Sequence, residues 1–246
     1  MSGHDLAEHR RGAVGGRPRA AGITERPPLL AAAGVAGPIV FTVAFVVQGL
    51  LRSGEYSAVA ETVSALEAGP NGWIQQVNFV VFGLLMIAYA IGLHLGVRPS
   101  RAGTVGPAIM VWTGVGAVLA AVFPLREDPA GLPYDPTGLH VVNAMLFFAS
   151  IGVGLIVLSR RLARDPQWRS LASYTLATGI AVVILFVGLP VLVVPDHAPL
   201  HPWAGLYQRA VLAVWFPCTI LLALRLRRVA RAAAVVPHQP PTGRQS

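Results

Sequence analysis

Six long apolar runs, separated by short polar segments, dominate the hydrophobic pattern of the chain. Each run is close to the roughly 20 residues that an α-helix needs to cross a hydrocarbon core of about 30 Å, and a helix satisfies its own backbone hydrogen bonds in lipid. The alternating strands of about ten residues that build a transmembrane β-barrel are absent from the pattern. We therefore predict an all-α polytopic membrane protein, a six-helix transmembrane bundle with short loops. The expected spans are Leu29–Leu51, Ile74–Val97, Gly103–Leu125, Leu139–Ser159, Leu171–Val194 and Leu206–Leu224.

The two ends of the chain differ from this apolar centre. Residues 1–28 and 229–246 are rich in Gly, Pro, Ala and Arg and lack hydrophobic periodicity. Such segments bury too little apolar surface to offset the entropy of ordering them. The predicted organisation is a disordered basic leader over residues 1–28, a transmembrane domain over 29–228 and a disordered tail over 229–246.

Charge fixes the expected orientation. Only 12% of the residues are charged, against about 25% in a typical soluble domain, and all 19 basic residues are arginine. Sixteen of them lie in the leader, the tail and the connections after the second and fourth spans, while Arg52, Arg126 and Arg209 lie on the other side. The positive-inside rule then predicts a multi-pass cell-membrane protein with both termini in the cytoplasm. Membrane lipids are the expected partners, since no nucleic-acid-binding motif accompanies the arginines; protein partners stay unknown.

The first outer loop has a helical pattern of its own. In the stretch Ser57–Ala68, the side chains of Val59, Val63 and Leu66 share one helical face, while Glu67 projects elsewhere. This spacing predicts a short interfacial helix. The second outer loop, 123–140, carries several charges and four prolines, and we expect its charges to lie in water or among headgroups.

Polar residues recur just below the predicted outer surface. Gln75 and Asn78 are three residues apart in the second span, and His140 and Asn143 repeat that spacing in the fourth, so each pair shares a helix face. Polar groups at membrane depth usually face the bundle interior and pair there. We predict one ligand-binding site near the outer leaflet; the alternative is that these groups only form interhelical hydrogen bonds. The candidate residues are Gln75, Asn78, His140, Asn143, Gln208 and Arg209.

Several short motifs resemble those of one family. They are GVAGP at 34–38, the Ser64 and Leu66 pair, GWIQQVNFVVFG at 72–83, Phe123-Pro124, His140, and GLYQR at 205–209. Together they resemble the domain of unknown function 998 family, prokaryotic membrane proteins with about six spans, over roughly residues 30–228. The resemblance implies the topology, and it implies no activity, substrate or catalytic residue.

Residues of the outer loops offer an alternative, enzymatic interpretation. His197 and His201 are four apart beside Asp196, a spacing that could hold zinc on a helix. Prolines interrupt that segment, however, and the His-Glu-x-x-His signature is absent. We therefore expect no metal site, and the catalytic residues of any such hydrolase stay unknown.

No other cofactor chemistry is indicated. The chain has one cysteine, Cys218, and it lacks a Walker loop, a dinucleotide fingerprint and a haem-attachment motif, so we expect no cofactor. A small-solute transporter is a further alternative, although no acidic residue lies within any expected span. Our leading interpretation is a non-enzymatic membrane protein that binds a lipid headgroup or a small polar ligand at an outer-leaflet pocket; a membrane-embedded hydrolase using outer His and Asp residues is the main alternative.

Overall fold

The computed structural model describes residues 26–97, 102–194 and 197–235. The long helices are α1 (Arg26–Leu51), α2 (Trp73–Gly96), α3 (Ala102–Val122), α4 (Leu139–Leu162), α5 (Arg169–Leu192) and α6 (Ala204–Val235). The short elements are the 3-10 helices η1 (Val63–Glu67) and η2 (His201–Trp203) and the strands β1 (Arg126–Glu127) and β2 (Pro133–Tyr134). The predicted leader and tail fall largely outside the described residues.

All six helices are long and apolar enough to cross a membrane, and each coincides with one predicted span. The all-α prediction is therefore confirmed, with one small addition: β1 and β2 pair antiparallel as a hairpin in the second outer loop. α3 ends at Val122, slightly earlier than predicted, because Pro124 disfavours helical backbone at the residue before it. α6 continues well past Leu224, through an Ala- and Arg-rich segment of high helix propensity.

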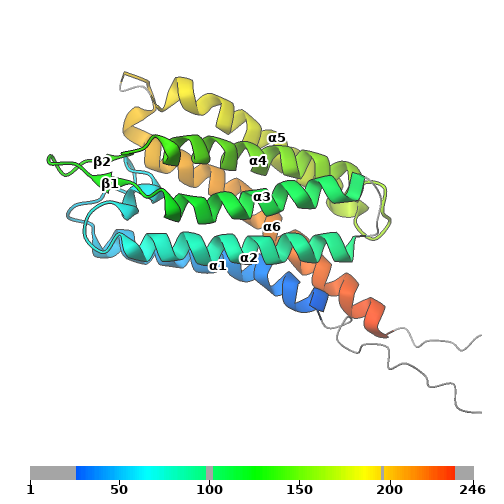
Figure 1. The fold of residues 1–246 in the computed structure, drawn as a ribbon. Helices are drawn as coiled ribbons and strands as arrows, with labels where there is room; N and C mark the ends of the chain where they lie inside the picture. The colour runs from blue at the N-terminus through cyan, green and yellow to red at the C-terminus, as the bar shows by residue number, and fades with distance from the viewer. Residues whose placement is uncertain (1–25, 98–101, 195–196, 236–246) are drawn as a thin grey trace, which may run out of the picture.

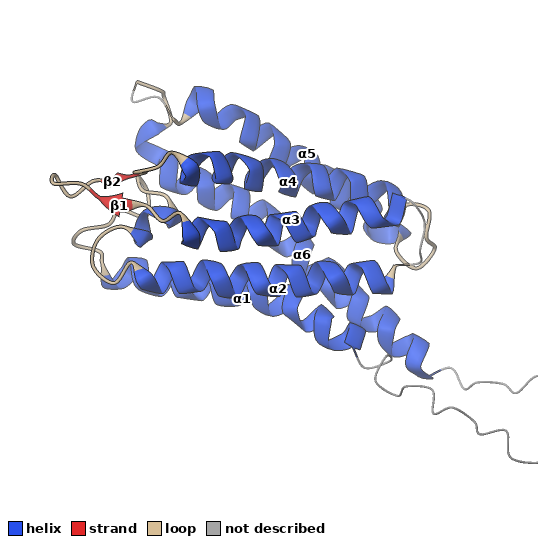
Figure 2. Ribbon diagram, in the orientation of Figure 1, coloured by secondary structure: helices blue, strands red, loops and turns tan. Residues whose placement is uncertain are grey.

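The six helices form a closed ring. Helices that are consecutive in the sequence pack side by side, and α6 closes the ring by packing against both α1 and α5 (Figure 1). α6 also contacts α2 across the interior. Figure 2 shows the helices aligned along one another, with the hairpin and the loops gathered at their ends.

Close helix contacts depend on paired glycines. A Cβ atom on Gly83 of α2 would lie 2.5 Å from the carbonyl oxygen of Gly114 on α3. Gly152 of α4 and Gly179 of α5 form the equivalent crossing, where a Cβ on Gly179 would lie 3.0 Å from the Gly152 oxygen. Small residues permit this close approach in lipid, where helix association depends on van der Waals packing.

The hydrophobic core draws buried residues from all six helices, and its aromatic part lies between α1, α2 and α6. Its centre is an aromatic cluster in which the ring centroids of Phe41 and Phe82 are 4.5 Å apart and those of Phe82 and Trp215 are 5.8 Å apart. Phe216 packs edge-on against Phe41 at 6.1 Å. Such offset and edge-to-face pairs add packing energy beyond their buried area.

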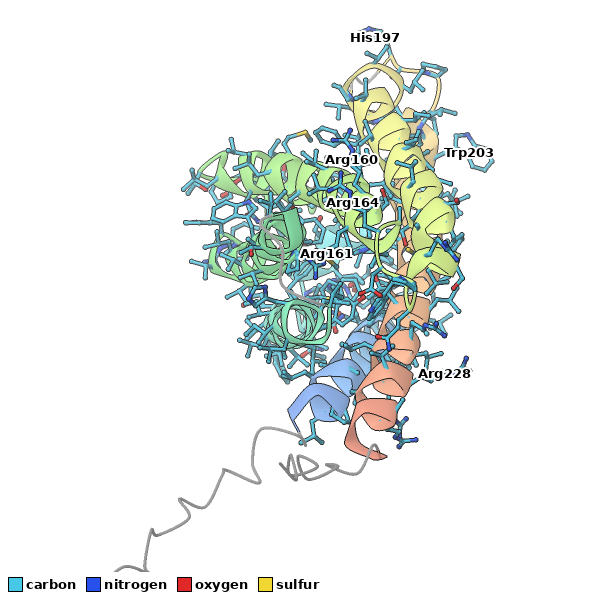
Figure 3. All side chains as sticks on the ribbon, turned by 90° about the vertical axis from the view of Figure 1, so that its right-hand side faces the viewer. Arg160, Arg161, Arg164, His197, Trp203 and Arg228 are labelled. Carbon is cyan, nitrogen blue, oxygen red and sulfur yellow. The ribbon has the colours of Figure 1, made fainter. Side chains whose placement is uncertain are left out.

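The two ends of the bundle carry different residues. We name the end with η1, β1, β2 and η2 the hairpin end, and the opposite end, where α1 begins and α6 finishes, the arginine end (Figure 1). Figure 3 looks onto the arginine end, where Arg160, Arg164 and Arg228 are exposed and Arg161 lies among the helix ends and is 5% exposed. The chain begins and finishes its six spans at one end, as an even number requires; that this end faces the cytoplasm stays a prediction.

The predicted interfacial helix over Ser57–Ala68 is wrong. Only Val63–Glu67 is helical, and it forms a short 3-10 helix. Val59 is 42% exposed, and Glu67, expected to project away from the apolar face, is buried. The reason is that side chains of other elements, described next, hydrogen-bond to the backbone of this loop and so replace the bonds of a regular helix.

Candidate functional site at the hairpin end

The end of α1 holds the first outer loop through hydrogen bonds to its backbone. Gln48 donates from Nε2 to the carbonyl oxygens of Leu66 at 3.1 Å and Asn71 at 3.2 Å. Arg52 donates from Nη1 to the carbonyl oxygens of Leu66 at 3.3 Å and Ala68 at 2.8 Å. These two side chains therefore fix the carbonyl groups on both sides of Glu67.

Glu67 lies inside the junction of three segments. Its side chain has no exposed surface, and its Oε2 is 3.5 Å from Nδ1 of His140 and accepts a long hydrogen bond of 3.4 Å from the backbone N–H of Leu125. The same Nδ1 lies 2.8 Å from the carbonyl oxygen of Phe123, to which it must donate because a carbonyl can only accept. Burial raises the pKa of Glu67 to about 8, although the Leu125 N–H opposes the shift.

Sequence reasoning missed Glu67 as a site residue. The helical spacing of the loop predicts only that Glu67 projects away from the apolar face, which gives no reason to expect a buried site residue. The available signal was its position next to Leu66, whose side chain is also fully buried. Neighbouring residues of a regular helix seldom share a face, but those of a short turn packed beneath a second loop can both be covered.

A small cavity lies beside this junction. Its volume is about 40 Å³, and its polar lining comes from three elements: Ser64 of η1, His140 and Asn143 of α4, and Gln208 of α6. The amide of Asn143 donates to the carbonyl oxygen of Gly116 at 2.8 Å, which fixes its orientation. Gln208 accepts the Val63 N–H through Oε1 at 2.6 Å, so α6 and η1 are joined at the cavity wall.

Gln75 and Asn78 form a separate pair on α2. Asn78 donates from Nδ2 to Oε1 of Gln75 at 3.2 Å and to the carbonyl oxygen of Phe41 at 3.1 Å. Both side chains are buried, but neither lines the 40 Å³ cavity. Their visible role is therefore to join α2 to α1.

Arg209 points toward the first outer loop. Its guanidinium donates to the carbonyl oxygens of Glu61 and Gly205, both at 3.0 Å, and to the Tyr56 hydroxyl at 2.5 Å. Its Cζ also lies 5.5 Å from the centre of the Phe45 ring, within the range of a cation–π contact. Backbone carbonyls, a hydroxyl and aromatic faces thus accommodate the charge, and Arg209 does not line the cavity.

The six candidate residues therefore occupy three places. His140, Asn143 and Gln208 line one cavity, Gln75 and Asn78 pair between α1 and α2, and Arg209 holds the first outer loop. The single convergence expected from the sequence is replaced by three neighbouring contacts. Ligand binding by any of them stays a prediction.

The third outer loop gives the zinc interpretation no geometric support. His201 places Nδ1 3.0 Å from the carbonyl oxygen of Val193, and Asp196 lies outside the described residues. Within the described ranges, no group of three or more His, Cys, Asp or Glu side chains is arranged to hold a metal ion.

Comparison with known protein families shows which family this six-helix chain matches. The family model described as DUF998, protein of unknown function, matches residues 35–226, which is most of the chain. The chain belongs to the DUF998 family. The resemblance inferred from its motifs is confirmed, and six apolar helices make this DUF998 protein a multi-pass integral membrane protein. No curated protein and no solved structure matches it. Membership of DUF998 therefore supplies no substrate or reaction.

Proposed function

We propose that this DUF998 protein is a membrane-embedded binding module that accepts a small polar group in the hairpin-end cavity. One observation carries the proposal: the polar side chains of Ser64, His140, Asn143 and Gln208 come from η1, α4 and α6 yet line one cavity. Polar groups from separate elements that converge on one space are typical of small-molecule sites.

The size of the cavity restricts the ligand. A volume of about 40 Å³ is far below the roughly 300–1,000 Å³ of a site for a drug-sized molecule, whereas a single water needs about 10–15 Å³. A whole lipid headgroup therefore exceeds the space. A molecule of a few non-hydrogen atoms fits it, as does the polar tip of a headgroup.

The lining also favours a neutral ligand group. It offers a hydroxyl, two amides and an imidazole, and it contains no arginine or carboxylate. Such groups form hydrogen bonds without supplying a compensating charge, so a hydroxyl-bearing group suits them better than a phosphate. Glycerol, which is also the polar end of phosphatidylglycerol, is an appropriate probe.

The test compares two valine substitutions on α4. Ala144 lines the cavity, whereas Ala149 is similarly half-buried on the same helix but lies outside it. We expect saturation-transfer NMR to detect glycerol bound to the wild-type protein and to Ala149→Val, and to lose the signal in Ala144→Val, where added methyl groups fill the space. Absence of a wild-type signal, or equal signals in both variants, would overturn the proposal.

A second arm distinguishes free solute from lipid. If the glycerol of a headgroup reaches the cavity, phosphatidylglycerol nanodiscs should raise the unfolding temperature relative to phosphatidylcholine nanodiscs, and Ala144→Val should remove that difference. If only free glycerol binds, the two lipids should give the same unfolding temperature.

A further inference from the structure

Glu67 has an environment unlike that of the other acids. Among the described acidic residues, it alone is buried, and its carboxylate belongs to a loop outside the spans. An ionised carboxylate without water must be paired with a cation or accept several hydrogen bonds, or else take up a proton. The identity of its neighbours decides among these three states.

The neighbouring charges leave Glu67 without a committed cation. Within 4.0 Å of its carboxylate, the basic group of the described chain is the His140 imidazole, whose Nδ1 proton is directed to Phe123. Arg52 of α1 donates instead to the carbonyl oxygens of Leu66 and Ala68. Charge compensation by a guanidinium is therefore absent from the described surroundings of Glu67.

The other charged groups around the junction do not compensate the negative charge of an ionised Glu67 either. Glu127 of β1 lies over Gly69, Asp135 lies near His140, and Arg209 of α6 is bound to the carbonyl oxygen of Glu61. Two of these three groups are acids, and the one cation among them is bound elsewhere, so none of them neutralises a negative charge on Glu67.

The two carboxyl oxygens of Glu67 have different surroundings. Oε2 accepts the Leu125 N–H, so it acts as an acceptor, and it lies 3.5 Å from His140 Nδ1, whose proton is directed to Phe123. Oε1 is buried and has no hydrogen-bond partner in the described chain. A proton on Oε1 removes the negative charge and leaves the acceptor role of Oε2 intact.

We propose that Glu67 is a proton-binding site that holds the loops of the hairpin end together. With the loops packed, a proton taken up from solvent is bound to Oε1, and the carboxyl group is neutral. When that proton returns to water, the buried carboxylate lacks a partner, and the junction of η1, the Phe123–Leu125 segment and α4 opens to hydrate it. Loss of a proton from Glu67 therefore favours the open junction.

The same element also forms a wall of the cavity. Ser64, which lines the cavity, stands three residues before Glu67 in η1, and so opening of η1 would admit solutes to the proposed ligand site. Only this gating step rests on the proposed function. Proton binding by Glu67 depends on the junction itself and is tested without any ligand.

Infrared difference spectroscopy tests the protonation directly. The full-length protein in nanodiscs, shifted from about pH 6 to about pH 9, should lose the carbonyl band of a protonated carboxylic acid, because the raised pKa of Glu67 lies between these values. Glu67→Gln should lack this change, and Glu55→Gln, which alters an exposed side chain before the same loop, should keep it. A wild-type protein without the band at about pH 6, or an unchanged band in Glu67→Gln, would refute the proposal; the first result would indicate an ion pair with protonated His140.

Hydrogen exchange tests the coupling to loop packing. After correction for intrinsic exchange, protection of the amides in η1 should fall about tenfold per pH unit from about pH 5 to about pH 8, since opening releases one proton in this range. Glu67→Gln should show pH-independent protection, with the exchange of α2 and α4 serving as a check that it is folded. A flat wild-type profile, or the same slope in a folded Glu67→Gln, would contradict proton-coupled opening.

Discussion

The arginines at the two ends of the bundle are used in different ways. At the hairpin end, Arg52 and Arg209 turn back onto the protein and donate to backbone carbonyl groups of the first outer loop. At the arginine end, Arg160 and Arg228 are exposed, although Arg225 donates from Nε to the carbonyl oxygen of Gln167 at 2.7 Å. Arg52 and Arg209 therefore hold a loop in place, whereas Arg126 of β1 is exposed. Most of the described arginines at the other end are exposed too and are available to headgroups.

This contrast bears on how polar residues in a membrane protein are interpreted. Gln48, Arg52, Gln208 and Arg209 all bind backbone groups of the loop that contains Glu67. Their positions at membrane depth resemble those of ligand-binding residues, yet each makes at least one hydrogen bond that orders irregular backbone. Backbone that is neither helix nor strand needs such partners near lipid.

The largest expected effect concerns which side of the membrane each end of the bundle faces. A reporter enzyme that is active only in the cytoplasm should be active when fused at either terminus, because arginine-rich segments are retained on that side. The same reporter inserted in the hairpin between β1 and β2 should be inactive. Activity in the hairpin and inactivity at both termini would show that the hairpin end, and not the arginine end, faces the cytoplasm.

A second prediction compares one arginine from each end. Arg209→Met should lower the free energy of unfolding by about 3 kcal/mol, because hydrogen bonds to charged groups contribute about 1.5–3 kcal/mol each and are not additive. Arg228→Met, at an exposed position, should change it by less than about 0.5 kcal/mol. Unfolding by denaturing detergent in mixed micelles gives both values. Equal losses would show that the contrast between the ends has no energetic basis.

A third prediction concerns pH. The pKa of Glu67 is raised from an ordinary value of 4.5 to about 8, so the folded state binds the proton more tightly than the unfolded state. Its stabilising contribution is therefore complete below about pH 4.5 and is lost as pH rises toward about 8, by at most about 1.4 kcal/mol per pH unit. Unfolding measured at about pH 6 and pH 8 should show this decrease in the wild-type protein, and Glu67→Gln should reduce it. An increase in stability over that range would contradict the assignment.

The smallest expected effect separates two glutamines. Gln48→Leu removes two hydrogen bonds to the first outer loop and should lower the free energy of unfolding by about 1–2 kcal/mol. Gln76→Leu is a matched control on α2, because the half-buried side chain of Gln76 makes no hydrogen bond to the described chain. Gln76→Leu should leave the free energy of unfolding nearly unchanged in the same assay. A larger loss from Gln76→Leu would mean that apolar substitution, and not loop anchoring, determines stability here.

The spans could be predicted because lipid imposes a uniform requirement on them. Any segment that crosses the hydrocarbon must be apolar and must satisfy its backbone internally, so the hydropathy of a run such as that in α4 specifies its structure locally. The close contact of Gly83 with Gly114 joins two such spans, and it became evident only in the structure. The spans themselves depend on residues close together in the sequence.

The hairpin end could be predicted only in part, because its contacts join distant segments. The apolar spacing of Val63 and Leu66 suggested a longer helix, but Gln48 and Gln208 bind the loop backbone from two other helices and hold it in a short turn. Burial of Glu67 similarly requires His140 and the segment after α3 to cover it. No local pattern encodes such a meeting of three segments.

The length of α6 sets how deeply the protein sits in the bilayer. At about 1.5 Å per residue, its 32 residues extend about 48 Å, whereas the hydrocarbon core is only about 30 Å thick. Its final turns therefore extend beyond the acyl chains. They carry Arg225, Arg227, Arg228 and Arg231. These four cations are excluded from the hydrocarbon. At the other end, Trp203 of η2, directly before α6, is 53% exposed and favours the interface. The anchors at the two ends of α6 thus oppose movement of the six-helix ring along the membrane normal in either direction.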